Sequence, residues 1–230
     1  MKFENSNVYN LENAIRGMRN PLNSWDKSDS EMDYDAGGDP HYKIGENDLK
    51  LAKKLLKSSE QRKFLRQIFV TVDITGPLYW WKEMDTYKVG TTANSTSTMH
   101  KLATTPITKD CFEMDDFDGD LCVDKPIPGE SWYTPHWHID SFWDILLNKL
   151  EELRRTLNDE NTNAETKKAL WKELVRLLPE SWLQTRTWAA NYEVLRNIYR
   201  QRKNHKLTEW HKFCGWMETL PYAKEFIIGE

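Results

Sequence analysis

The chain has 230 residues, 30% of them charged, and a formal net charge of −4 at pH 7. This length suits a single domain with a substantial core, expected over residues 1–230. The weak negative charge excludes a broad basic surface for a nucleic-acid polymer, and no apolar run approaches the ~20 residues that cross a membrane. Three cysteines without ligand-like spacing and a polar start without a signal-peptide pattern predict a cytoplasmic protein.

The first half of the chain contains predicted helices, a loop and one clear strand. Residues 11–18 form a short amphipathic segment, and residues 20–42, rich in Asn, Ser, Asp and Gly, are typical of a long loop. Residues 46–67 carry apolar side chains at helical spacing and predict a helix with a break near Ser58. Phe69 to Pro77 alternates β-branched or aromatic with small polar residues, which predicts a strand.

Residues 111–140 are predicted to be an acidic, turn-rich insert. A stretch from Asp116 resembles a calcium loop, but the required Glu at its twelfth position is Ile127, so calcium is not expected. Three residues at alternate positions could ligate a metal ion from one face of an extended segment: His136, His138 and Asp140. Because further ligands are not evident nearby, we favour a structural or solvent-facing pair and predict no metal site.

Helices are predicted for most of the second half. Residues 141–157 and 164–178 show an amphipathic division, and residues 209–226 form a predicted last helix. On a further helix over residues 188–209, one face would hold Asn191, Leu195, Ile198, Arg202, His205 and Glu209. Amide, guanidinium, imidazole and carboxylate groups are costly to bury without partners. This face is therefore expected either to be solvated and crossed by ion pairs or to surround a polar ligand.

The run from Leu178-Pro179 to Arg202 resembles the C-terminal half of the flavin-dependent thymidylate synthases. The family pattern places Leu-Pro before a segment with Asn-x3-Leu-x-Asn-x4-Arg. Its order and spacing are kept here by Pro179, Trp188, Asn191, Leu195, Asn197 and Arg202. In the family, the second Asn contacts the flavin and the Arg contacts the uracil nucleotide. The resemblance implies these roles for Asn197 and Arg202.

The family's signature helix, Gln-x2-Arg-His-Arg-x2-Ser-x2-Glu-x-Ser-x-Arg-Tyr, follows a strand and a Pro and is degenerate here. Counted from Pro77 without gaps, its positions hold Glu83, Thr86-Tyr87-Lys88, Thr91, Asn94, Thr96 and Thr98-Met99. A shift by one residue would instead align Asn94, Ser97 and His100. Lys88 keeps one positive charge without the bidentate geometry of arginine. Thr98 replaces the Arg that grips the nucleotide, and Gln67 replaces a flavin-contacting His.

The resemblance implies an α/β fold with a twisted central sheet flanked by helices, and a homotetramer with sites between subunits. It implies an enzyme that uses FAD, with NADPH and methylenetetrahydrofolate as co-substrates, to transfer a one-carbon unit to dUMP or a related pyrimidine deoxynucleotide. The implied catalytic residue is Arg202, which would bind the nucleotide together with Thr96, Asn94 and Glu83. The implied flavin-binding residues are Asn197, Asn191, Lys88, Thr91 and His205.

Two other classes of function stay open at this point. Loss of Arg-His-Arg favours a catalytically silent homologue that acts as a nucleotide-binding or assembly protein. A metal hydrolase built on His136, His138 and Asp140 is the third candidate.

Overall fold

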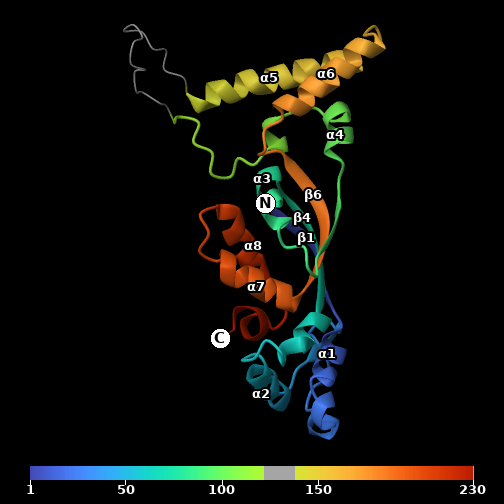
Figure 1. The fold of residues 1–230 in the computed structure, drawn as a ribbon, viewed down its shortest axis with the longest axis vertical. Coiled ribbons are helices and arrows are strands. Elements are labelled where there is room, and N and C mark those ends of the chain that lie inside the picture. Colours follow the sequence, from blue (N-terminus) through green and yellow to red (C-terminus); the bar gives the residue numbers. More distant parts are fainter. Residues whose placement is uncertain (122–137, 230) are drawn as a thin grey trace. The chain divides into compact units, whose positions relative to one another are not determined.

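The computed structural model describes residues 1–121 and 138–229, and its chain divides into two units. The first comprises Met1–Thr75, Lys82–Ser95 and Thr185–Glu230, and the second comprises Gly76–Trp81 and Thr96–Gln184. Each unit has its own buried core. Figure 1 shows the elements of both units. The single domain expected over residues 1–230 stays a prediction.

The largest sheet has four strands in the order β1-β4-β6-β5 (Figure 1). The strands are β1 Lys2–Tyr9, β4 Phe69–Pro77, β5 Thr92–Ser95 and β6 Leu183–Asn191. β1 pairs with β4 and β5 pairs with β6, both in antiparallel register. In the element order, helices lie between these strands and after the last one. This confirms the predicted α/β class with a sheet flanked by helices.

β4 confirms the strand predicted from alternating residue types. Its buried side chains include those of Val70, Val72 and Ile74, and they alternate with partly exposed polar residues. On the polar face, Asp73 accepts a hydrogen bond of 2.5 Å from the Thr187 hydroxyl of β6. The apolar face therefore packs into the core, while the polar face contributes bonds to the neighbouring strand.

Helices α7 (Tyr192–Arg202) and α8 (Thr208–Glu218) lie on one side of the strands in the first unit (Figure 1). The ring of Phe213 in α8 is fully buried. Its centroid lies 6.0 Å from that of Phe3 in β1 and 5.8 Å from that of Trp188 in β6. Because aromatic rings bury large apolar areas, these contacts hold α8 on the sheet.

The single helix predicted over residues 188–209 is wrong. Trp188 belongs to β6, where it pairs with Ala93 of β5, and α7 begins only after Asn191. His205 lies in the turn that follows α7, and Glu209 is buried in α8. Leu195, Ile198 and Arg202 do lie in one helix, α7, as predicted, whereas pairing with β5 keeps Trp188 and Ala189 extended.

The last helix is shorter than the predicted span of 209–226. α8 ends at Glu218, and a separate π-helix covers Lys224–Ile228. Between them Tyr222 has a φ of 55°. A bulky residue with positive φ cannot continue a right-handed helix, so the chain is interrupted there.

The N-terminal part of the first unit contains α1 (Leu11–Gly17), α2 (Glu46–Leu55) and a 3-10 segment, Arg62–Gln67. The amphipathic segment and the break near Ser58 are thus confirmed. The long loop predicted over residues 20–42 is wrong, because these residues include regular elements. They are two 3-10 turns, Asn20–Leu22 and Trp25–Lys27, and a hairpin of β2 (Glu31–Tyr34) with β3 (Pro40–Lys43).

The second unit contains α4 (Thr98–Thr104), a 3-10 turn (Lys109–Cys111), α5 (Ile139–Asn158) and α6 (Ala164–Leu177), while α3 (Leu78–Met84) crosses between the units. α5 and α6 lie side by side, which confirms the two predicted helices (Figure 1). Their core consists of Leu102, Ile107, Phe112, Leu150, Leu174 and Trp182. Residues 122–137 of the predicted acidic insert, His136 among them, lie outside the described residues. Throughout residues 1–121 and 138–229, every helix is too short or too polar to cross a membrane.

Candidate functional site

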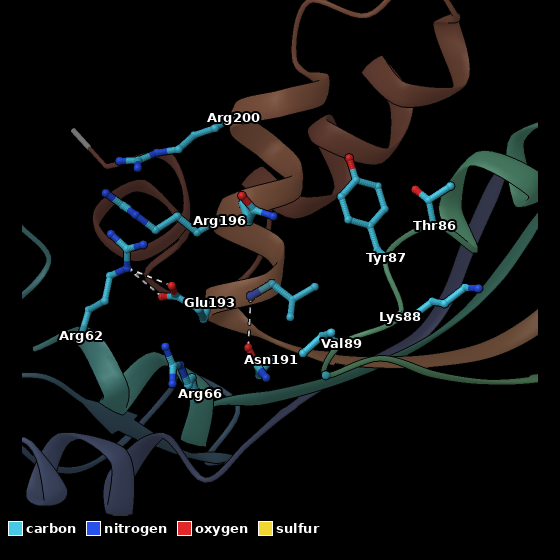
Figure 2. Close-up of a pocket in the computed structure, with 13 residues that line it drawn as sticks. Arg62, Arg66, Thr86, Tyr87, Lys88, Val89, Asn191, Glu193, Arg196 and Arg200 are labelled. Atoms are coloured by element: carbon cyan, nitrogen blue, oxygen red, sulfur yellow. Dashed lines mark hydrogen bonds and ion pairs between the residues drawn. The ribbon is translucent and has the colours of Figure 1, made fainter. Parts of the chain in front are cut away.

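A cleft of about 570 Å³ lies in the first unit beside the N-terminal half of α7 (Figure 2). It is lined by Arg62, Arg66, Thr86, Tyr87, Lys88, Val89, Gly90, Asn191, Glu193, Val194, Arg196, Asn197 and Arg200. These residues come from three parts of the chain: the 3-10 segment before β4, the loop between α3 and β5, and the junction of β6 with α7.

Asn191 positions the start of α7 at the wall of the cleft. Its side-chain oxygen accepts a hydrogen bond of 3.1 Å from the backbone N–H of Val194, which caps the helix. Gly90 packs closely against this cap, with a φ of 75°. A Cβ at Gly90 would lie 3.1 Å from Nδ2 of Asn191 and 3.2 Å from Cγ2 of Val194. Glycine therefore allows the loop of residues 85–91 to approach the helix cap.

The cleft carries an excess of positive charge. Its cationic side chains are those of Arg62, Arg66, Lys88, Arg196 and Arg200, and its one carboxylate is that of Glu193. Nε of Arg62 lies 2.9 Å from both carboxylate oxygens of Glu193. Since only one of the five cations is neutralised within this lining, the cleft is suited to phosphate groups.

Burial disfavours the charge of Arg196. Its side chain is 5% exposed, and burial lowers its pKa from the usual value, with repulsion from Arg200 and Arg62 acting in the same direction. An anion brought into the cleft would relieve this repulsion. The local electrostatics therefore favour an anionic ligand near α7.

Arg202, at the end of α7, is held in a second cluster. Its Nη1 donates a hydrogen bond of 2.8 Å to Oε2 of Glu83, and its Nε donates one of 2.8 Å to the Tyr87 hydroxyl. Its guanidinium carbon lies 4.6 Å from the ring centroid of Trp210, which is cation–π geometry. The indole N–H of Trp210 donates to the same oxygen of Glu83 at 2.9 Å. Arg202 is thus fixed by a carboxylate, a phenol and an indole.

His205 completes this cluster. Its Nε2 lies 3.5 Å from Oε2 of Glu83, and its Nδ1 accepts a hydrogen bond of 3.2 Å from the backbone N–H of Leu207. Tyr87 connects the cluster to the cleft, because its ring lines the cleft while its hydroxyl binds Arg202. The two groups of side chains are therefore adjacent within one unit.

The structure brings together most of the predicted site residues in these two places. Three of the predicted flavin-binding residues line the cleft: Asn191, Asn197 and Lys88. A fourth, Thr91, donates its hydroxyl to the carbonyl of Tyr87 without lining the cleft. Arg202, Glu83 and His205 form the second cluster. The functional roles of these residues stay predictions.

Two predicted nucleotide-binding residues lie elsewhere. Asn94 is exposed on β5, opposite Thr187 of β6. Thr96 belongs to the second unit, where its carbonyl accepts a hydrogen bond of 2.9 Å from Gln184. Neither residue lines the cleft.

Sequence reasoning missed four arginines of the cleft: Arg62, Arg66, Arg196 and Arg200. Arg66 follows Arg62 by four positions and Arg200 follows Arg196 by four, a spacing that places two side chains on one face of a helix. This spacing is the signal that could have drawn attention to them. The sequence does not show that these two pairs of arginines lie close together in the fold.

The candidate metal ligands have other partners in the described part of the chain. Asp140 accepts a hydrogen bond of 2.5 Å from Nζ of Lys109, and Nδ1 of His138 lies 3.3 Å from the carbonyl oxygen of Asp120. Among residues 1–121 and 138–229, no group of three or more His, Cys, Asp or Glu side chains is placed to hold a metal ion.

The fold is that of the flavin-dependent thymidylate synthases. One similar solved structure is the synthase ThyX from Helicobacter pylori complexed with FAD and dUMP, with a TM-score of 0.64, 18% identity and 98% of both chains covered. A second ThyX structure from this organism, also with FAD and dUMP, has a TM-score of 0.61 and 16% identity, covering 96% of this chain and 93% of that one.

A third similar structure is the UMP/dUMP methylase PolB from Streptomyces cacaoi bound with 5-Br dUMP. Its TM-score is 0.56 at 14% identity, with 98% of this chain and 89% of that chain covered. No family model and no curated protein matches the sequence. At these identities the likeness establishes the fold, and at that level it confirms the resemblance predicted from the motifs.

Proposed function

We propose that this protein is a diverged flavin-dependent thymidylate synthase. It binds FAD in the basic cleft and a pyrimidine deoxynucleotide near Arg202, and it transfers a one-carbon unit to dUMP or a related pyrimidine. The observation that carries this proposal is the cleft itself, which gathers Asn191, Asn197 and Lys88 among four arginines in a chain with this fold.

The residues of the cleft fit the chemistry of FAD. Its diphosphate needs cationic partners, which Arg66, Arg200 and Lys88 supply. Asn197 presents an amide that could bind the polar edge of a flavin ring, and it lies on the exposed side of α7. When bound and reduced, FAD would supply hydride, with NADPH as reductant and methylenetetrahydrofolate as one-carbon donor.

The role proposed for Arg202 is to hold the pyrimidine and stabilise negative charge on it. Glu83, Tyr87 and Trp210 orient the guanidinium, so little ordering is needed when the nucleotide binds. Asn94 is proposed as a further hydrogen-bonding partner of the nucleotide, and Thr91 and His205 as supports of the flavin, while the role of Thr96 stays a prediction. A homotetramer with shared sites and a cytoplasmic location complete the proposal.

The visible absorbance spectrum of the purified protein, recorded after addition of FAD and desalting, tests the cofactor. We expect a retained flavin spectrum. Oxidation of NADPH in the presence of dUMP and methylenetetrahydrofolate then tests the enzyme. A protein that stays colourless after reconstitution would contradict the proposal at its first step.

A catalytically silent, nucleotide-binding homologue is the second candidate. The contacts of Arg202 favour it, because Glu83 already occupies the guanidinium that a nucleotide would need. The single Lys88 in place of Arg-His-Arg favours it as well. A folded protein that binds dUMP but never oxidises NADPH would support this candidate over the enzyme.

A further inference from the structure

A second cavity, of about 360 Å³, lies in the first unit and shares three of its lining arginines with the cleft. It is lined by Lys53, Leu56, Lys57, Arg62, Arg196, Arg200, Glu225 and Gly229. Arg62, Arg196 and Arg200 also line the cleft, and Figure 2 shows their guanidinium groups gathered on one side of it, away from Lys88 and Thr86. The three arginines therefore line both cavities, whereas Lys53 and Lys57 line only the smaller one.

The charges of the smaller cavity are not balanced within its lining. Five cationic side chains face one carboxylate, that of Glu225, and one of the five, Arg62, is paired with Glu193. Lys53 lies in the last turn of α2 and Lys57 in the turn that follows it, and both side chains are exposed to solvent. An excess of positive charge drawn from three chain segments is what a ligand with several negative charges requires.

Arg196 gives this cavity the character of a built site. Its side chain is 5% exposed, and its Nε has no hydrogen-bond partner among the described residues. Its Nη1 donates to the carbonyl of Phe226 at 2.9 Å, which fixes the guanidinium plane. A buried N–H without a partner costs free energy. Because Nε itself is buried, an anion in the cavity would act on Arg196 through its charge.

The C-terminal segment closes over this guanidinium. Gly229 has a φ of 86°, and a Cβ at this position would lie 2.8 Å from both terminal nitrogens of Arg196. Any larger residue would displace the arginine or the backbone. The fold thus holds a buried cation at the wall of a cavity that also has the exposed side chains of Lys53 and Lys57 in its lining.

We propose that this smaller cavity is a polyphosphate-binding site, separate from the cleft assigned to FAD. Lys53 and Lys57 hold the outer phosphates, and Arg196 supplies positive charge at the inner wall. The volume exceeds that of a single phosphate group, and the cations lie on α2, the turn after it, the 3-10 segment and α7. The ligand class is therefore a di- or triphosphate, either inorganic or attached to a nucleoside. Occupation alongside FAD would let a phosphorylated metabolite act on the cleft through the shared arginines.

The test is a calorimetric titration of the full chain with inorganic tripolyphosphate, with and without saturating FAD. With FAD in the cleft we expect one binding site, and weaker binding as the salt concentration rises. Without FAD we expect this site to persist, and the basic cleft can then take up the anion as well. The double variant Lys53→Ala/Lys57→Ala should weaken tripolyphosphate binding by about tenfold or more without altering FAD retention. The matched control is Lys50→Ala/Lys54→Ala, which removes two lysines of α2 that line neither cavity and should bind as the unaltered chain does.

Three further arms separate this proposal from the proposed function. Lys88→Ala should lower FAD retention and leave tripolyphosphate binding intact, because Lys88 lines only the cleft. If FAD does not bind, the titration without FAD still tests the proposal, because it compares the Lys53→Ala/Lys57→Ala variant with its control. Repeating it with dTTP shows whether a nucleoside adds affinity. Displacement of FAD by tripolyphosphate, or equal affinities of the two double-lysine variants, would overturn the proposal.

Discussion

Glu83 and Arg202 are joined by an ion pair of 2.8 Å between Oε2 and Nη1, with side-chain exposures of 34% and 19%. The sequence resemblance placed both residues at the nucleotide, as separate ligands. The structure instead makes them partners of each other. Any nucleotide that uses Arg202 must share this guanidinium with Glu83 or displace the carboxylate.

We expect Arg202→Ala to abolish dUMP binding in a chain that remains folded. The pair with Glu83 is partly exposed, so its removal together with the Trp210 contact should lower the free energy of unfolding by only about 1 kcal/mol. Calorimetry with dUMP and urea unfolding measure the two effects. Lys203→Ala, which removes an exposed neighbouring charge, is the control. Unchanged dUMP affinity in folded Arg202→Ala would remove the assignment.

Glu83→Gln should raise the affinity for dUMP by about threefold or more. The amide keeps an oxygen for the N–H groups of Arg202 and Trp210 but no longer neutralises the guanidinium or repels the nucleotide phosphate. In the ungapped match to the family's signature helix, glutamine stands at this position. The comparison is between dUMP dissociation constants of the variant and the unaltered chain. A weaker affinity would instead mean that the Glu83 carboxylate itself contacts the nucleotide.

Lys88 is expected to determine FAD affinity through the diphosphate. Lys88→Ala should reduce the flavin retained after desalting, and Lys88→Arg should increase it, because a guanidinium binds phosphate oxygens in a bidentate manner. The ratio of flavin to protein absorbance gives the result. Val89→Ala, a neighbouring substitution in the same lining that keeps the charge, serves as control. Equal retention in all three variants would place the diphosphate elsewhere.

Asp48 is a buried residue of α2 that binds side chains of the segment before this helix. Its side chain is fully buried, and its Oδ1 accepts a hydrogen bond of 2.5 Å from Nε of Arg19. Its Oδ2 accepts hydrogen bonds of 2.6 Å from the hydroxyls of Ser28 and Ser30. Asp48→Ala should destabilise the fold by about 3 to 5 kcal/mol, because Arg19 would keep an uncompensated buried charge. Thermal unfolding measures the loss. Glu46→Ala, which breaks an exposed pair on the same helix, should change stability by less than about 1 kcal/mol.

Glu151 should make the second unit sensitive to acid. Hydrogen bonds from Arg154 hold the pKa of Glu151 at about 2, against an ordinary 4.5, with burial opposing and the Ile107 N–H and Arg155 assisting. Because the folded pKa lies below the unfolded one, this stabilisation is present above pH 4.5 and is lost as the pH falls toward 2. Glu151→Gln should therefore cost about 2 kcal/mol at pH 7, with the difference from the unaltered chain vanishing near pH 2.

Urea unfolding at several pH values, followed by tryptophan fluorescence, measures this dependence. Glu152→Gln is the matched control, since Glu152 is exposed and pairs only with exposed Lys149 in the described part of the chain. A difference between Glu151→Gln and the unaltered chain that persists unchanged at pH 2 would contradict the assignment of the stabilisation to the ionised carboxylate.

The local sequence determined those elements in which apolar and polar side chains follow a strand or helix period within one stretch of chain. Val70, Val72 and Ile74 alternate with polar residues over a whole strand, so β4 was predictable. The α5 and α6 helices were predictable from their amphipathic spacing, and the family pattern from Pro179 to Arg202 identified the fold. In each case the information lies within one contiguous stretch of chain.

The tertiary structure alone decided the edge strand and the composition of the cleft. β1 is mostly exposed, so its polar sequence carries no strand pattern, and only pairing with β4 makes it a strand. Residues 188–191 match a helical period, yet they belong to β6, where Trp188 and Ala189 pair with β5. Arg62 and Arg196 lie far apart in the sequence, and the fold brings their guanidinium groups together. Such contacts depend on long-range packing, whose free energy outweighs the local propensities that a sequence displays.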